Sequence, residues 1–298
     1  MSLSNSTIKE IKGTAWLLPA IVVVSVVVFY PLLYMAYLSF FRWDLTLGDN
    51  LKYIRFENYT NILEDVFFWR SIGRSLGFTL LIVPVELLVG FFMAIGLNYF
   101  QIGKVKKTLQ FMLILPYMMT SIVIATVWKI IFNNDFGILN WLLSQLGLPT
   151  VIWLGNPVAA FFSVALVEIW RNMPFVFLIT TAGLLTMPKE IYEAAKLDGA
   201  GKIQTIRYII LPQLRNTLLA GGIFLAIDAF RVFDTSYVLT QGGPGRTTEF
   251  ISIYIFNSGF KYFKLGQTAA QGLVLLGCTL LFILPLVFFL NKSIQARK

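Results

Sequence analysis

The sequence contains no histidine, and this absence removes several kinds of chemistry at once. Without an imidazole, the chain can form neither a histidine metal site, nor a Ser-His-Asp triad, nor the HExxH motif of zinc proteases. Cysteine is almost absent as well. Cys278 is the single one, so no intrachain disulfide can form, and its apolar surroundings favour a small core residue. No serine-centred motif replaces the missing groups, so a membrane-embedded enzyme is disfavoured.

Charge is also scarce. Charged residues make up 13% of the 298 residues, whereas an average soluble protein carries about 25%. Hydrophobic residues make up 57%, and the mean hydropathy is +0.74. So few charges leave too little polar surface to cover a globule in water, and we therefore expect most of the chain to lie in lipid.

Six stretches are long and apolar enough to cross a bilayer, which takes about 20 residues. They are residues 13–41, 75–103, 108–128, 158–185, 216–240 and 265–291. The first greatly exceeds the 7–15 apolar residues of a secretory signal, and it holds Pro31 and the bulky pair Phe40-Phe41 where a cleavage site would need small residues. We therefore expect it to remain in the membrane. The predicted fold is an all-α polytopic bundle with six transmembrane helices.

The positive charge lies on one side of these spans. With six spans, both termini face the same side as the second and fourth connections. That side carries 13 basic and four acidic residues, a net of +9, while the remaining 11 basic and 11 acidic residues cancel. The positive-inside rule makes this side cytoplasmic. Nucleic-acid binding would instead need a basic patch interleaved with aromatic residues. The 13 basic residues are Lys9, Lys12, Lys104, Lys106, Lys107, Lys189, Lys196, Lys202, Arg207, Arg215, Lys292, Arg297 and Lys298.

The connection between the fourth and fifth spans, residues 186–215, is predicted to be a helix–turn–helix. Pro188 suits a first helical turn, and a short amphipathic helix follows it. Gly199 and Gly201 can adopt the positive backbone dihedrals of a sharp turn. A second short helix is expected to end or kink at Pro212. The face of the first helix is formed by Ile191, Ala194, Ala195 and Asp198, and that of the second by Ile203, Ile206 and Ile210.

The same connection carries a specific signature. Glu193-Ala194-Ala195, three further positions, Gly199, nine further positions and then Ile209, Leu211 and Pro212 match the pattern EAA-x3-G-x9-I-x-LP. The chain thereby resembles the permease component of binding-protein-dependent ABC importers. The resemblance implies a type-I importer fold in which this segment, the EAA loop, inserts into an ATP-binding subunit. The residues it assigns to ATPase coupling are Glu193, Ala194, Ala195, Asp198, Gly199, Leu211 and Pro212.

Softer motifs extend the resemblance over nearly the whole chain and point to its carbohydrate-uptake branch. They lie at residues 29–31, 56–59, 170–174 and 233–244. The resemblance implies a sugar or oligosaccharide as cargo, with a glycerol phosphate or another solute as the alternative. A secondary transporter is a more distant alternative, because no pair of interrupted spans recurs in two halves and the EAA loop would have no role.

The resemblance also implies partners. They are a second, related permease, two cytoplasmic ATP-binding subunits and an external solute-binding protein, in a prokaryotic inner membrane with both termini cytoplasmic.

The chain itself has no P-loop. The nearest candidate, Gly201-Lys202, has Lys196 and Ile203 where the motif needs glycine and a hydroxyl residue. We therefore expect no enzymatic activity and no bound cofactor here, with ATP and Mg²⁺ on the partner ATPase. The expected organisation is an N-terminal part (1–70), a five-helix core (71–291) and a tail (292–298).

A few charges fall inside the predicted spans, where each costs about 2.5–3.5 kcal/mol unless it faces protein or water. Glu86 stands alone in span two and is interpreted as a structural hydrogen-bonding group. Spans four and five carry the others, spaced by three. These faces are predicted either to line a hydrophilic cavity for cargo or to form ion pairs that lock the two spans together. The candidate pathway residues are Glu168, Trp170, Arg171, Asp228, Phe230, Arg231 and Asp234.

Overall fold

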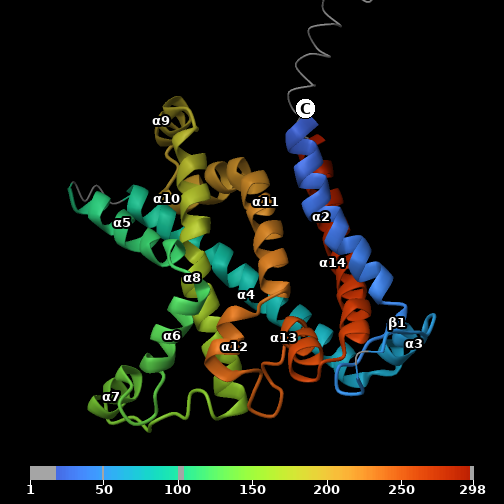
Figure 1. Cartoon of the computed structure of the whole chain (residues 1–298). Coiled ribbons are helices and arrows are strands. Elements are labelled where there is room, and N and C mark those ends of the chain that lie inside the picture. The colour runs from blue at the N-terminus through green and yellow to red at the C-terminus, as the bar shows by residue number, and fades with distance from the viewer. Residues whose placement is uncertain (1–17, 49, 100–103, 296–298) are drawn as a thin grey trace, which may run out of the picture. The chain divides into compact units, whose positions relative to one another are not determined.

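The computed structural model describes residues 18–48, 50–99 and 104–295, and helices dominate it (Figure 1). In chain order the elements are α2 (Leu18–Leu38), β1 (Phe41–Arg42), β2 (Lys52–Tyr53), α3 (Glu57–Glu64), α4 (Val66–Tyr99), α5 (Lys104–Met118), α6 (Ser121–Ile131), α7 (Ile138–Gln145), α8 (Pro157–Leu185), α9 (Lys189–Leu197), α10 (Lys202–Thr205), the π-helical turn η1 (Ile206–Ile210), α11 (Leu211–Phe230), α12 (Asp234–Thr240), α13 (Ile251–Phe256), the π-helical turn η2 (Asn257–Lys261) and α14 (Leu265–Gln295). The prediction of an all-α polytopic protein is confirmed.

The contacts divide the chain into two units. One comprises Met1–Asp65 and Ile255–Leu276. Its helix α2 is apolar on all sides and almost entirely exposed, as expected of a helix that faces lipid or another subunit. Asn58 ties α3 to the end of α2, because its Nδ2 donates to the carbonyl groups of Ser39 (2.8 Å) and Phe41 (2.9 Å). Gly266 has no room for a side chain, since a Cβ there would lie 2.0 Å from the carbonyl oxygen of Phe41.

A short β-hairpin, with two residues in each strand, lies in the same unit. In it β1 and β2 pair antiparallel, with Phe41 opposite Tyr53. The turn that follows β1 is ordered by Asp44, whose Oδ1 accepts hydrogen bonds from the hydroxyl (2.5 Å) and the N–H (2.9 Å) of Thr46. These bonds, the one from the hydroxyl above all, lower the pKa of the Asp44 carboxyl.

The other unit comprises Val66–Tyr254 and Gly277–Lys298. Its core forms where α4, α8 and α11 pack together, and Gly90 of α4 lies directly against α8. A Cβ at Gly90 would lie 2.4 Å from Cβ of Val176, so only glycine permits this crossing. Fully buried apolar side chains fill the core, among them Phe78, Ile82, Val164, Val167, Val176, Leu225, Ala229 and Phe250.

The spans agree with the predicted ones in number but not in continuity. Among the described residues, five helices are long and apolar enough to cross a membrane, and a bent pair makes a sixth if its halves count as one span. That pair is α5 and α6, which meet at an angle of 103° in the middle of the predicted third span. Pro116 lies in the last turn of α5 and has no N–H with which to continue the helix. Thr120 and Ser121 lie at the break, but the predicted span carries no charge, so its mean hydropathy does not reveal the break.

The fifth span also ends earlier than predicted. The sequence predicts a helix over 216–240, but α11 stops at Phe230 and α12 begins at Asp234. The intervening turn is supported by Ser252, whose hydroxyl donates to the carbonyl of Arg231 (3.1 Å). Ser236 in α12 donates to the carbonyl of Thr248 (2.9 Å). These contacts with the following segment favour a separate short helix over an extended span.

Candidate functional site

The EAA loop, residues 186–215, forms the predicted helix–turn–helix. Helix α9 begins after Pro188 and ends before Asp198. The turn follows at Gly199, whose φ of +73° lies in the left-handed region. The N–H of Ala200 then donates back to the carbonyl of Ala195 at 2.9 Å, which closes the end of the helix. The prediction that Gly199 makes the sharp turn is confirmed.

Two details of this loop differ from the prediction. Gly201 has a φ of −71° and needs no special backbone freedom; its N–H donates to Oε1 of Gln204 at 2.7 Å. Pro212 does not end a helix. The chain runs as one helical segment from Lys202 to Phe230, and Pro212 lies in the first turn of α11, directly after η1. A π-helical turn rearranges the backbone hydrogen bonds locally, so the helix continues past a residue without an N–H.

The loop has one face toward its own unit. Ile210 and Leu214 are buried with Phe91 and Ile95 of α4, and Tyr192 and Ile206 pack against them. Ala195 is buried too, whereas Glu193, Ala194, Asp198 and Gly199 are exposed. The predicted face of Ile191, Ala194, Ala195 and Asp198 is therefore divided between interior and surface.

Two apolar side chains of the loop are unexpectedly exposed. Leu197 is 89% exposed and Ile203 is 80% exposed, on either side of the Gly199 turn. The helical pattern had placed Ile203 with Ile206 and Ile210, which is wrong because Ile203 points away from the buried side. Leu197 was not singled out in the sequence. Its position two residues before a predicted turn glycine, where a polar residue is common, is the signal that could have found it.

The membrane charges of spans four and five meet in a charge cluster, which consists of Glu168, Arg171 and Asp228. Nη2 of Arg171 lies 2.7 Å from Oε2 of Glu168 on the same helix and 2.6 Å from Oδ2 of Asp228 on α11. The Glu168 side chain is 1% exposed and that of Asp228 is 42% exposed. The cluster therefore links α8 to α11 and reaches a more open region at Asp228.

The cluster continues into span two through an amide. Nδ2 of Asn172 lies 3.1 Å from Oε1 of Glu86 and 3.5 Å from Oε2 of Glu168. Glu86 thus forms the structural hydrogen bond that was predicted for it. Asn172 was not among the predicted site residues, although its place beside Arg171 in an apolar span was a usable signal.

A small polar cavity of about 110 Å³ adjoins the charge cluster. Arg231 and Asp234 lie at it, both exposed, and neither forms an ion pair with any residue that the structure describes. Nε of Arg231 donates to the carbonyl of Ile227 at 3.4 Å. Sequence reasoning missed four lining residues, which are Ser121, Val232, Phe233 and Thr235.

Two predicted pathway residues lie elsewhere. Trp170 packs edge-on against Trp128, with ring centroids 5.7 Å apart, and Phe230 is buried in a stack with Phe282. Neither lines this cavity. Phe230 was grouped with the charged residues of span five, but residues two apart on a helix point to different sides, and Phe230 faces α14 instead.

A bundle of membrane-spanning helices with a charge cluster between two of them and a helical loop joining the same two is the architecture of a membrane transport component. The chain belongs to the family described as binding-protein-dependent transport system inner membrane component, whose profile matches residues 86–297. The members of this family are membrane permeases of ABC importers, not enzymes.

Similar proteins cover most of the chain. A trehalose/maltose transport system permease of Thermococcus litoralis is 35% identical over 255 residues, which is 86% of this chain and 84% of the relative. A sulfoquinovosyl glycerol transport system permease of Agrobacterium fabrum is 33% identical over 259 residues, 87% and 83% of the two chains. A crystal structure of a bacterial ABC transporter that imports the acidic polysaccharide alginate matches with a TM-score of 0.84, 22% identity and coverage of 97% and 99%. This last likeness establishes the type-I importer permease fold.

Proposed function

We propose that this chain forms one half of the translocation path for a sugar or oligosaccharide in an ATP-driven importer. A related second permease supplies the other half, and an external binding protein delivers the cargo. Two ATP-binding subunits on the cytoplasmic side supply the energy through the EAA loop. Relatives named as transport permeases for trehalose or maltose, for sulfoquinovosyl glycerol and for diacetylchitobiose support a carbohydrate cargo.

The observation that carries the proposal is the complete EAA signature on an exposed helix–turn–helix. Glu193 and Ala194 are exposed beside the Gly199 turn, and Leu197 and Ile203 add apolar surface there. Apolar side chains that remain in water on a short loop are typical of a contact surface for another protein. The proposed contact surface is held in place from below, because Ile210 and Leu214 are buried against α4 and fix the second half of the loop.

The charge cluster and its cavity support a cargo path between α8 and α11. Asp228, Arg231 and Asp234 offer carboxylate and guanidinium groups at the cavity. Sugar hydroxyls both donate and accept, so these groups are suitable partners for them. Arg171 has a second role in the proposal, since its ion pair with Asp228 also holds α8 and α11 together, while Glu168 pairs with Arg171 within α8.

Energy coupling gives the first prediction. The purified chain alone is expected to show no ATPase activity, because the sequence has no P-loop. The assembled importer should hydrolyse ATP, and binding protein loaded with its sugar should stimulate the rate several-fold over unloaded protein. The measurement is phosphate release at fixed permease concentration, with an importer whose ATP-binding subunit lacks its P-loop lysine as control. Hydrolysis by the isolated chain, or stimulation only by a non-sugar solute, would contradict the proposal.

Membrane orientation gives the second prediction. A cysteine at Gln241 is expected to react with an impermeant thiol reagent added outside cells whose outer barrier has been removed, whereas one at Lys202 should not. Both positions are exposed in the structure, so burial does not decide the result. Cys278 is first replaced by alanine to remove the native thiol. Labelling at Lys202 without labelling at Gln241 would reverse the proposed orientation.

A further inference from the structure

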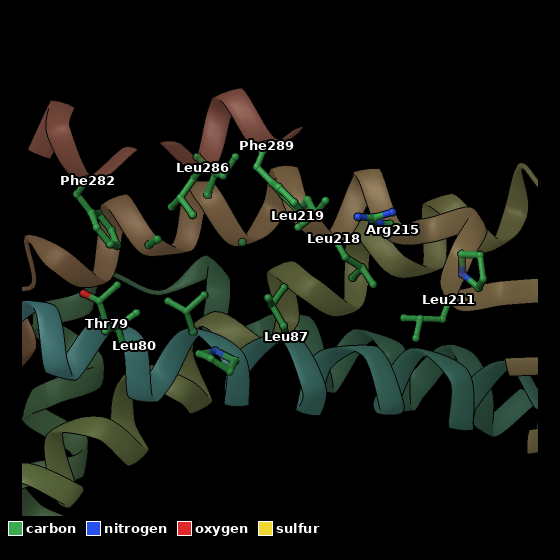
Figure 2. A pocket seen from close by; sticks show the side chains of 16 residues that line it. Thr79, Leu80, Leu87, Leu211, Arg215, Leu218, Leu219, Phe282, Leu286 and Phe289 are labelled. Carbon is green, nitrogen blue, oxygen red and sulfur yellow. The ribbon is translucent and has the colours of Figure 1, made fainter. Parts of the chain in front are cut away.

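An apolar groove of about 700 Å³ lies in the unit formed by Val66–Tyr254 and Gly277–Lys298 (Figure 2). Its walls come from three membrane-spanning helices, α4, α11 and the second part of α14. Figure 2 shows Phe282, Leu286 and Phe289 of α14 above side chains of α11 and α4. Leu211, Pro212 and Arg215 at one end of the groove are also among the last residues of the EAA loop. The groove does not include the exposed Gly199 turn and shares no lining residue with the polar cavity, and the proposed function gives it no ligand.

The lining carries a single charge. Apart from Arg215, Thr79 is the one lining residue with a polar side chain, and its hydroxyl is already donated to the carbonyl of Ser75 at 2.8 Å. Arg215 is exposed, and its guanidinium lies 5.7 Å from the ring centroid of Phe289. Within the described ranges, no carboxylate forms an ion pair with it. An apolar groove with one available cation suits a molecule that has a hydrocarbon part and an anionic part.

A second cation lies at the same end of the groove. Oγ of Ser293 and Oδ1 of Asn216 are 2.8 Å apart, which places the last turns of α14 beside the start of α11. Lys292 immediately precedes Ser293, and Arg215 immediately precedes Asn216. Residues 211–227 and 277–298 contain no aspartate or glutamate. Positive charge at this end is therefore not neutralised from these helices.

We propose that this groove holds an acyl chain of an anionic phospholipid, with the phosphate headgroup at Arg215 and Lys292. From Leu211 to Ala226, the lining of α11 rises about 22 Å, more than the depth of one leaflet's hydrocarbon, about 15 Å. The volume falls in the range of about 300–1,000 Å³ that is usual for ligand sites. Basic sites between spans on the cytoplasmic side are suited to acidic headgroups. The choice of the cytoplasmic leaflet rests on the proposed orientation.

A helix of the second permease fits this groove less well. A helix with its side chains is about 10–12 Å in diameter, far wider than a single acyl chain. A docking helix would also form no specific interaction with a cation at the end of an apolar groove. An acyl chain is narrower, and its headgroup uses the cation.

The test measures lipid retention on the purified importer by native mass spectrometry. The complex is incubated with phosphatidylglycerol or phosphatidylcholine of identical acyl chains. We expect preferential retention of phosphatidylglycerol, and a loss of about fivefold in Arg215→Gln and again in Lys292→Gln, the effect of one cation near an anionic lipid. Arg207→Gln is the matched control, because Arg207 is an exposed cation nearby that does not line the groove.

A second variant tests the apolar part. Ile223→Trp adds bulk to the groove lining and should remove both lipids while Arg215 stays in place. Equal retention of the two lipids, or unchanged phosphatidylglycerol retention in Arg215→Gln, would overturn the proposal. So would a disulfide between a cysteine at Ile223 and a spanning helix of the second permease in a lipid-free complex. None of these measurements depends on ATP hydrolysis or cargo, so their failure is distinct from a failure of the proposed transport function.

Discussion

Replacing Gly199 with valine is expected to release the ATP-binding subunits and reduce transport at least tenfold, while the permease remains inserted in the membrane. At a φ of +73° a β-branched residue is strained, at a cost of about 1–2 kcal/mol. Apart from the two neighbouring residues of the chain, no described residue has an atom within 4 Å of the new Cβ, so the added bulk faces outward, toward the proposed partner. The strained turn and the bulky side chain should both disturb the contact.

Gly201→Val is the matched control for this experiment. Gly201 has a φ of −71° in the extended region, where valine is well tolerated, and its nearest neighbour would be Oε1 of Gln204 at 3.6 Å. Glu193→Lys is expected to behave like Gly199→Val, because it replaces a proposed attraction to a cation on the ATPase by repulsion. The measurement is the amount of ATP-binding subunit recovered through the tagged permease, together with the transport rate. Full recovery and normal transport in both Gly199→Val and Glu193→Lys would remove the EAA loop from coupling.

Replacing Arg171 with glutamine is expected to have the largest effect on assembly. The change leaves Glu168 nearly buried without a cation and also removes the partner of Asp228. Breaking a buried pair by removing one partner typically costs about 3–5 kcal/mol. We therefore expect little assembled permease in the membrane and a lower melting temperature of whatever is purified.

Two further variants separate this structural role from a role in cargo binding. Arg231→Gln should assemble normally, because Arg231 is exposed and forms no ion pair with the described residues, so poor transport in this variant would indicate contact with cargo. The triple variant Arg171→Gln, Glu168→Gln and Asp228→Asn should recover part of the assembly, since no uncompensated charge remains. Normal assembly in Arg171→Gln would refute the structural role of the cluster.

The sequence was most informative where a residue has few alternatives. Gly199 was expected to adopt a positive φ because glycine does so at little cost, and it does. Arg171 and Asp228 were expected to face protein rather than lipid, because exposure of an ion to hydrocarbon is costly, and they pair with each other. The spacing of the charges also predicted, as one of two alternatives, that ion pairs join spans four and five, and Arg171 and Asp228 form such a pair.

The remaining details depend on tertiary contacts that no local pattern encodes. The 103° bend at the end of α5 lies within a charge-free and mostly apolar run, and one proline does not distinguish a kink from a break. The end of α11 at Phe230 depends on contacts that Arg231 in the turn and Ser236 in α12 make with residues 248–252, which lie later in the chain. The exposure of Ile203 is equally invisible locally, because a contact surface for a partner has the composition of a core.

The uninterrupted course from Lys202 to Phe230 makes this segment a single lever. The helical path from Lys202 to Asp228 is about 39 Å long, so a tilt imposed at the loop end would displace the charged end as well. No relay of side chains is needed for that motion to reach the ion pair between Asp228 and Arg171. The stiffness of the lever depends on η1, because a π-helical turn is the point at which a helix bends most easily.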